Sequence, residues 1–222
     1  MTVFYLIRHG ETAWNALGRW QGHTDVPLSP VGEEQARRVA ERLKTGGTRF
    51  AALYSSDLQR AWATAETIGA ALGLAPQPVP DLRELDIGWW GGLTNAEIRE
   101  RDPETTALVE RGEDPPRGGA ECWADLRRRA GAAVERLAQA HPDQALLLVT
   151  HGGVVRAVLN HVTAAAPQLA APKHHIGNTS ITVVVRTPEG WDIGVVNDMS
   201  HLEGSPQAPD MLSAPPDDAT RV

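Results

Sequence analysis

The chain has 222 residues, of which 41% are hydrophobic and 22% charged, proportions typical of a soluble globular domain with a substantial core. Its net charge of -7 argues against nucleic-acid binding, which needs a basic surface. A single cysteine excludes an internal disulfide and favours a reducing compartment. Because no apolar run approaches the roughly 20 residues that span a bilayer, we expect a cytoplasmic protein with no membrane partner.

The first half of the chain predicts strands and helices in alternation. Val3 to Ile7 is a continuous apolar run, typical of a strand buried on both faces of a parallel sheet. A helix is predicted to begin at Ser29, which can cap its N-terminus. Pro30 suits the first turn, and the acids that follow suit the positive end of the helix dipole. The predicted elements are a strand at 3–7, a helix at 29–44, a strand at 51–54, a helix at 57–72 and an edge strand at 75–79.

The second half of the chain predicts one irregular stretch, followed again by helices that alternate with strands. Residues 88–117 are expected to be irregular, with a short helix at 94–101 and breaks at Pro103 and at Pro115-Pro116. A helix at 121–140, a strand at 145–149, another helix and a hairpin of 181–185 with 191–196 follow. This order predicts an α/β three-layer sandwich, a mostly parallel central sheet flanked by helices. We expect a single domain at 1–202 and a loose C-terminal tail at 203–222.

Two of the predicted core strands end in the same kind of segment. The first runs into Arg8-His9-Gly10 and the later one into Thr150-His151-Gly152-Gly153. Glycine lets a backbone approach a ligand closely, and the helix that follows offers free N–H groups to an anion. The strand at 51–54 leads to Arg60 at the same edge of the sheet, where ligands of such sheets bind. Two arginines there could grip phosphate oxygens bidentately.

This set of residues suits a histidine nucleophile. A neutral imidazole of His9 could attack phosphorus while Arg8, Arg60 and His151 stabilise the phosphoryl oxygens. The leaving oxygen needs a proton, which a carboxylic acid would supply. Glu84 and Asp86 are both candidates, and Glu84 is favoured. The plainer alternatives are a structural histidine at a strand end and carboxylates that form surface ion pairs.

With these motifs, the sequence resembles the histidine phosphatase superfamily, the phosphoglycerate mutase-like proteins. The motifs occur in that family's order between about Thr2 and Leu202: 8–12 with Asn15, 20–22 with 25–29, 55–61, 83–90 and 150–153. The resemblance implies His9 as nucleophile, Arg8, Arg60 and His151 as phosphate ligands, and Glu84 as acid and then base. It also implies that Asn15, Gln21, Gly22 and Gly152 line the substrate pocket, with no metal and no other cofactor. The chain departs from the family's pattern at Gly91, where an acid is common, and at Cys122, where serine is commoner.

Three other features have competing interpretations. His174-His175 with His161 or His201 could suggest a metal site, but their spacing favours surface histidines. Cys122 and Arg128 have the spacing of a cysteine phosphatase, but the residues between them lack the glycines of a phosphate loop. Trp89, Trp90 and Trp123 could be either core or an apolar rim over the site.

We therefore predict a phosphomonoesterase that acts on a small organic phosphate ester, with a homodimer left open. A cofactor-dependent phosphoglycerate mutase is the first alternative, although the short, charge-balanced stretch at 88–119 and the Asn197-Asp198 ending favour a phosphatase. A non-catalytic phosphate-binding module is the second, but binding alone would need neither His9 nor Glu84.

Overall fold

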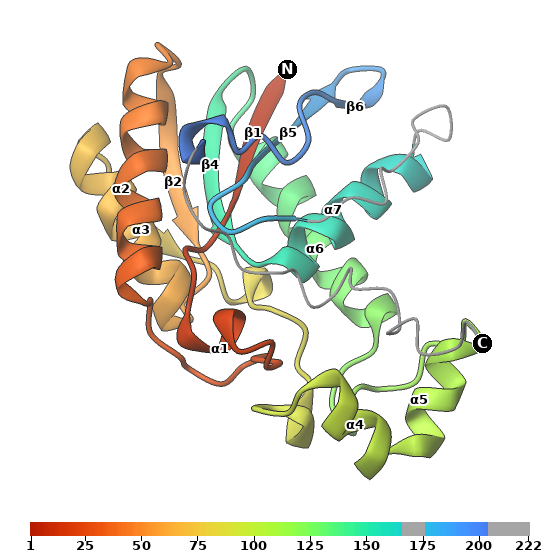
Figure 1. The fold of residues 1–222 in the computed structure, drawn as a ribbon. Coiled ribbons are helices and arrows are strands. Elements are labelled where there is room, and N and C mark those ends of the chain that lie inside the picture. The colour runs from red at the N-terminus through yellow and green to blue at the C-terminus, as the bar shows by residue number, and fades with distance from the viewer. Residues whose placement is uncertain (166–175, 204–222) are drawn as a thin grey trace.

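The computed structural model describes residues 1–165 and 176–203, which form an α/β fold around a six-stranded sheet with strand order β3-β2-β4-β1-β5-β6 (Figure 1). Strands β1 to β4 are parallel, and β5 and β6 add an antiparallel edge. The predicted fold, with a mostly parallel sheet, is therefore confirmed. The strands are β1 (Thr2–Arg8), β2 (Phe50–Ser55), β3 (Pro76–Pro78), β4 (Ala145–Thr150), β5 (Ile181–Thr187) and β6 (Gly190–Ile193).

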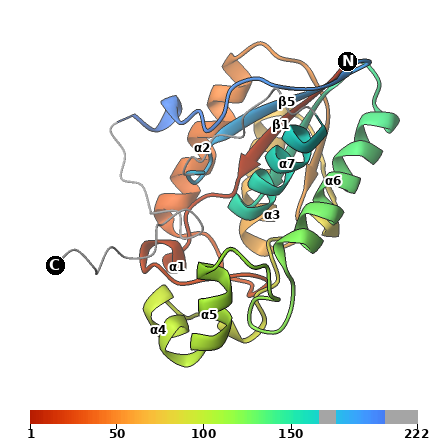
Figure 2. The ribbon, with the colours of Figure 1, turned by 90° about the vertical axis from the view of Figure 1, so that its right-hand side faces the viewer.

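Helices cover both faces of the sheet (Figures 1 and 2). Alternate side chains of β4 point to opposite faces: Leu146 and Leu148 pack with α6 (Trp123–Ala140) and α7 (Gly152–Ala165). Leu147 and Val149 pack with α2 (Pro30–Thr45) and α3 (Gln59–Leu72). All four side chains are 0% exposed, which explains why this strand is apolar without alternation.

The expected cap of the first long helix is present. The Ser29 side chain accepts a hydrogen bond from Gly32 N, and Pro30 occupies the first turn of α2. At its C-terminal end, α3 stops at Gly73, which adopts the left-handed conformation with φ of 71°. The prediction of an edge strand with prolines is also correct, since β3 lies at one end of the sheet.

Several predicted boundaries are wrong. The helix predicted before Pro103 does end at Arg101, but the chain after this break is not irregular. Pro103 lies in the first turn of α5 (Pro103–Glu110), where proline loses no helical hydrogen bond and Asp102 caps the helix. The hairpin's second strand ends at Ile193 instead of continuing to 196, and α6 begins at Trp123, two residues later than predicted. The short helix α1 (Ala13–Ala16) was not predicted. The predicted tail lies outside the described residues, apart from its first residue.

The N-terminus of the chain lies at one end of the sheet, and α1 with the pair α4 (Asn95–Arg101) and α5 lies beyond the other end (Figure 2). That other end is where β1 and β4 finish, so the irregular stretch forms a cap next to the strands' carboxyl ends. Three short 3-10 helices, η1 (Pro80–Leu82), η2 (Gly88–Trp90) and η3 (Ser200–Leu202), connect the larger elements. Among the described residues, no helix is both long enough and apolar enough to cross a membrane.

Candidate active site

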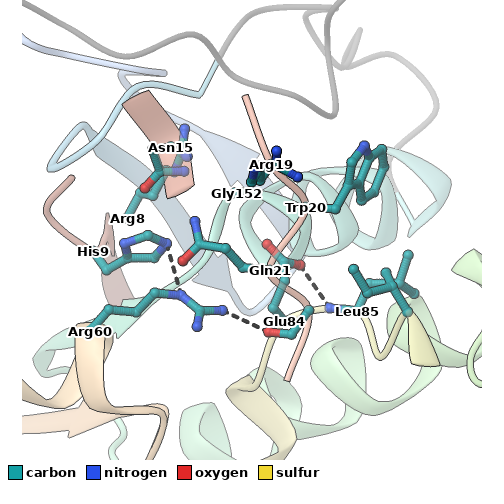
Figure 3. A pocket seen from close by; sticks show the side chains of 12 residues that line it. Arg8, His9, Asn15, Arg19, Trp20, Gln21, Arg60, Glu84, Leu85 and Gly152 are labelled. Atoms are coloured by element: carbon teal, nitrogen blue, oxygen red, sulfur yellow. Dashed lines mark hydrogen bonds between the residues drawn. The ribbon is translucent and has the colours of Figure 1, made fainter. Parts of the chain in front are cut away.

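A cavity opens at the carboxyl ends of β1 and β4 (Figure 3). Side chains from five separate parts of the chain line it, which is the convergence that the motifs predicted. The lining residues are Arg8, His9, Asn15, Arg19, Trp20, Gln21, Gly22, Arg60, Glu84, Leu85, Ile87 and Gly152.

His9 follows β1 and is held in one tautomer. Its Nδ1 lies 2.6 Å from the carbonyl oxygen of Gly10, which can only accept, so Nδ1 carries the hydrogen. Its Nε2 accepts a hydrogen bond from Nε of Arg60 over 3.3 Å (Figure 3). The lone pair of Nε2 therefore faces the Arg60 guanidinium in the cavity.

The pKa of His9 is held well below 6.5, mainly by burial and further by the charges of Arg60 and Arg8. Both arginines are themselves buried, at 1% and 4% exposure. Burial lowers the pKa of each guanidinium to about 10, which leaves both charged at neutral pH. The site thus combines a neutral imidazole with two cations in a largely dehydrated setting.

Arg60 is fixed by backbone oxygens. Its Nη1 donates to Thr24 O over 2.9 Å and its Nη2 to Gly22 O over 2.8 Å. Arg8 donates from Nη1 to the carbonyl of Ile176, in the segment before β5. These backbone acceptors orient both guanidinium groups in the cavity wall, where their positive charge can meet an anion.

His151 follows β4 and, unlike Arg8 and Arg60, is not among the residues that line the cavity, but its ring centroid lies 5.1 Å from that of His9. Its Nε2 lies 2.8 Å from Ser56 Oγ, and that hydroxyl accepts from Leu58 N and so can donate to the ring. The Nδ1 of His151 has no hydrogen-bond partner among the described residues. Burial, followed by the charge of Arg60, lowers the pKa of His151 well below 6.5, so this ring is neutral as well.

Of the two candidate acids, the structure places Glu84 in the cavity wall and Asp86 outside it. Glu84 Oε1 accepts from Leu85 N over 2.8 Å, and Oε2 accepts from Gly153 N at the start of α7 over 3.1 Å. Asp86 instead caps the turn at Gly88, and 43% of its side chain is exposed.

The four residues expected around the substrate all line the cavity. Asn15 also closes a capping box with Thr12 at α1, and Gln21 accepts a hydrogen bond from the Thr12 hydroxyl. Gly22 has φ of 50°, and a Cβ there would lie 2.4 Å from Ile87. Glycine is therefore required at that close approach.

The sequence assigned no role to several residues of this site. Arg19, Trp20, Leu85 and Ile87 line the cavity, and of these only Arg19 lies outside the predicted motifs. Asn178 supports its floor, since its Nδ2 donates to the carbonyl oxygen of His9 over 3.0 Å. An asparagine between two predicted elements carries no local pattern that would mark it as part of a site.

With this geometry established, comparison with known proteins gives the family. The model of the histidine phosphatase superfamily (branch 1) matches residues 4–199. The chain belongs to that superfamily. Among curated relatives, a metal-independent phosphoserine phosphatase from Arabidopsis thaliana is 39% identical, over 91% of this chain and 84% of the relative. A phosphoglycerate mutase-like protein 4 from the same plant is also 39% identical, over 89% and 86%.

Solved structures of other histidine phosphatases agree. Phosphoserine phosphatase from Entamoeba histolytica, in complex with 3-phosphoglyceric acid, matches with a TM-score of 0.80 and 29% identity, over 91% of this chain and all of that one. Mycobacterial glucosyl-3-phosphoglycerate phosphatase, in complex with VO3, matches with a TM-score of 0.76 and 29% identity, over 88% and 98%. The predicted family and the predicted phosphatase class, for small phosphate esters, are confirmed.

In this histidine phosphatase, the residues considered for a metal site and for a cysteine phosphatase loop have other positions and contacts. His161 bonds Glu135 and His201 bonds Thr179, each over 3.1 Å, while 174 and 175 lie outside the described residues. The described residues contain no cluster of three or more potential metal ligands. Cys122 stands at the start of α6, and the Arg128 side chain is 78% exposed beside Asp125.

None of the three tryptophans with two predicted roles lines the cavity. Trp90 is core, with 4% exposure, whereas Trp89 is 52% exposed. Trp123 is partly buried against the same core as Trp90. The tryptophan that lines the cavity is Trp20, whose Nε1 donates to Asn95 at the start of α4.

Proposed function

We propose that this protein hydrolyses small phosphate monoesters through a phosphohistidine intermediate on Nε2 of His9. The observation that carries the proposal is the state of this ring: its Nδ1 hydrogen is held by Gly10 O, so Nε2 keeps a lone pair. That lone pair faces Arg60, in a cavity that Arg8 also lines. A neutral nucleophile beside two cations is suited to attack on a phosphate dianion.

In the first step, Nε2 of His9 forms a bond to phosphorus as the bond from phosphorus to the ester oxygen breaks. Glu84, in its protonated form, gives its proton to the departing oxygen, which leaves as an alcohol. Arg8 and Arg60 stabilise the charge on the transferring group. The partnerless Nδ1 of His151 supports a similar role for that ring, because a buried N–H gains a hydrogen bond when a phosphoryl oxygen comes into reach.

In the second step, water attacks the phosphoryl group on His9. Glu84, now a carboxylate, takes a proton from the water as the bond from phosphorus to Nε2 breaks, and inorganic phosphate leaves. Glu84 thus returns to its protonated form and His9 to the neutral ring, so the cycle balances without a further reactant. Asn15, Gln21, Gly22 and the Gly152 amide are proposed to contact the phosphate or the substrate's organic part.

The relatives' substrates bear on the organic part. Phosphoserine and glucosyl-3-phosphoglycerate are named for proteins similar to this one, and both are small polar esters. We extend that class to this chain. The single cysteine and acidic charge support action in the cytoplasm without a nucleic-acid partner.

The mutase alternative remains distinct in its chemistry. A mutase must return the phosphoryl group to an organic acceptor faster than water takes it. Relatives of this chain include a phosphoglycerate mutase-like protein and several probable phosphoglycerate mutases, so the distinction requires a direct measurement. The stretch between η2 and α6 is short, and three of its four arginines, Arg99, Arg111 and Arg117, are each paired with a carboxylate, which favours the phosphatase.

The test is phosphate release from 4-nitrophenyl phosphate and from a panel of sugar phosphates, phosphoserine, phosphoglycerates and nucleotides. We expect turnover on the panel, and its abolition in His9→Ala with the fold intact. Conversion of 3- to 2-phosphoglycerate that depends on a bisphosphoglycerate, faster than phosphate release, would assign the mutase. Phosphate binding without turnover of any ester would assign the binding module.

A further inference from the structure

Arg129 lies on α6, outside the cavity, yet it grips the segment that carries the proposed acid. Its Nη1 donates to Asp81 O over 2.8 Å and to Arg83 O over 2.6 Å. Its Nη2 donates to the carbonyl oxygen of Glu84 itself over 2.8 Å. One guanidinium group therefore donates hydrogen bonds to three backbone carbonyl oxygens between Asp81 and Glu84, and the last of these belongs to the proposed acid.

A carboxylate fixes the other side of this guanidinium. Glu121 accepts from Arg129 Nε over 2.7 Å and from Nη2 over 2.9 Å, a bidentate pair whose side chains are only 15% and 20% exposed. The same carboxylate accepts from Asp86 N over 3.0 Å, and the Glu121 and Asp86 backbones bond to each other. The acid's segment is thus held on both sides of Glu84.

The backbone carbonyl of Glu84 has a second donor. Nε2 of His23, from the loop that also contains Gly22, lies 2.8 Å from the same oxygen. Hydrogen bonds therefore hold Glu84 both at its backbone carbonyl and at its side-chain carboxylate, which accepts from the amides of Leu85 and Gly153. Because the strand before it ends at Pro78 and the chain then follows only a single 3-10 turn, regular secondary structure does not set the position of the acid.

We propose that Arg129, braced by Glu121, is a positioning residue for the proton donor Glu84. This inference rests on the proposed function, because Arg129 would act on the proton transfer by holding Glu84 in place. It would take no part in phosphate binding. Lysine cannot replace it: an ammonium is a point donor, and only the planar fork can bond Glu121 and three carbonyl oxygens together.

The test uses leaving groups that differ in their need for a proton. Phenyl phosphate leaves as a phenol of pKa about 10, whereas 2,4-dinitrophenyl phosphate leaves as a far more acidic phenol that needs no proton. We compare kcat/KM, which covers the steps up to formation of the phosphoenzyme and excludes its hydrolysis. A misplaced acid therefore slows phenyl phosphate selectively, whereas a damaged phosphate site slows both esters.

For Arg129→Lys we expect kcat/KM to fall about 100-fold with phenyl phosphate, the loss typical of a reacting group misplaced by about 1 Å, and by less than about 3-fold with 2,4-dinitrophenyl phosphate. Glu84→Gln serves as the reference and should show the same selectivity. Arg136→Lys is the matched control, since Arg136 lies two turns along the same helix and contacts the Asp81 side chain, but is 59% exposed. It should behave as the wild type.

The ratio between the two esters is unaffected by the fraction of enzyme that is folded, so a destabilised variant still answers the question. Equal losses with both esters in Arg129→Lys, beside a selective loss in Glu84→Gln, would overturn the positioning role and leave the proposed function standing. Absence of selectivity in Glu84→Gln would overturn Glu84 as proton donor and this inference with it. A selective loss in both variants supports the inference.

Discussion

Arg60 donates a hydrogen bond from Nε to Nε2 of His9 over 3.3 Å, which pairs a permanent cation with the nitrogen proposed to attack phosphorus. Burial, followed by the charge of Arg60, lowers the pKa of the ring, and the bond orients the ring toward Arg60. Attack requires the same lone pair, so the Arg60 N–H must exchange His9 for a phosphoryl oxygen when substrate enters. Arg60 is already fixed by Gly22 O and Thr24 O, so this exchange needs little movement.

Arg60→Lys tests that arrangement. A lysine cannot bond His9, the two carbonyl oxygens and a phosphoryl group from one rigid plane. We expect kcat/KM for 4-nitrophenyl phosphate to fall about 100- to 1000-fold, as when one preorganised donor to a developing charge is removed. Arg37→Lys, on the exposed side of α2, is the control and should change little. A loss below about 10-fold in Arg60→Lys would show that charge alone is enough.

The ionisation of His9 can be observed directly. Its pKa lies well below 6.5 because of burial and two neighbouring cations, so the ring should stay neutral as the pH falls from 7.5 through 6.5. The 15N chemical shifts of the imidazole should report a protonated Nδ1 and an unprotonated Nε2 across that range. Titration of His9 near 6.5 would contradict the buried, cation-flanked site.

Gly153→Ala should separate activity from stability. A Cβ at this position would lie 2.1 Å from Glu84 Oε1, so the carboxylate must move away from the start of α7. Alanine favours a helix over glycine by about 1 kcal/mol, so thermal stability should hold or rise. We expect kcat/KM for phenyl phosphate to fall at least about 10-fold by misplacement of the acid. Unchanged kinetics would show that this contact does not matter.

His201 should make the fold sensitive to acid. Burial lowers its pKa to about 4, against 6.5 for a free imidazole. The unfolded chain therefore binds a proton between these values while the folded protein does not, so stability is present above pH 6.5 and is lost as the pH falls toward 4. Between pH 7 and 4.5 this half-buried group accounts for at most about 2 kcal/mol of the free energy of unfolding, because solvent screens part of the effect.

The variant His201→Gln removes that contribution. Urea unfolding at the two pH values should show a smaller loss of stability than in the wild type, by up to that amount. His9 and His151 add losses of the same sign in both proteins, so the comparison isolates His201. Parallel losses in the wild type and the variant would refute a buried, neutral His201.

The sequence was sufficient for the central strands and the helices that cover them. Val3 to Ile7 and Ala145 to Val149 are apolar without alternation because both faces of their strands are buried, and that requirement is visible residue by residue. The start of α2 at Ser29 and Pro30 was equally local, since a cap acts on the next three residues. The prediction placed the break at Pro103 but missed α5, because proline fits both a break and the first turn of a new helix, and the Asp102 cap joins the two helices directly.

The sequence alone predicted which side chains would gather wherever a chemical group stands beside a strand end, because parallel strands bring such ends to one edge of the sheet. Arg8, His9, Arg60 and Glu84 do line one cavity, and His151 lies beside His9. Only the tertiary structure separates Glu84, in the cavity wall, from Asp86, fixes the tautomer of His9, and brings Arg129 and Asn178 next to these residues. Those relationships depend on distances between segments far apart in the chain, and packing sets such distances where no local pattern records them.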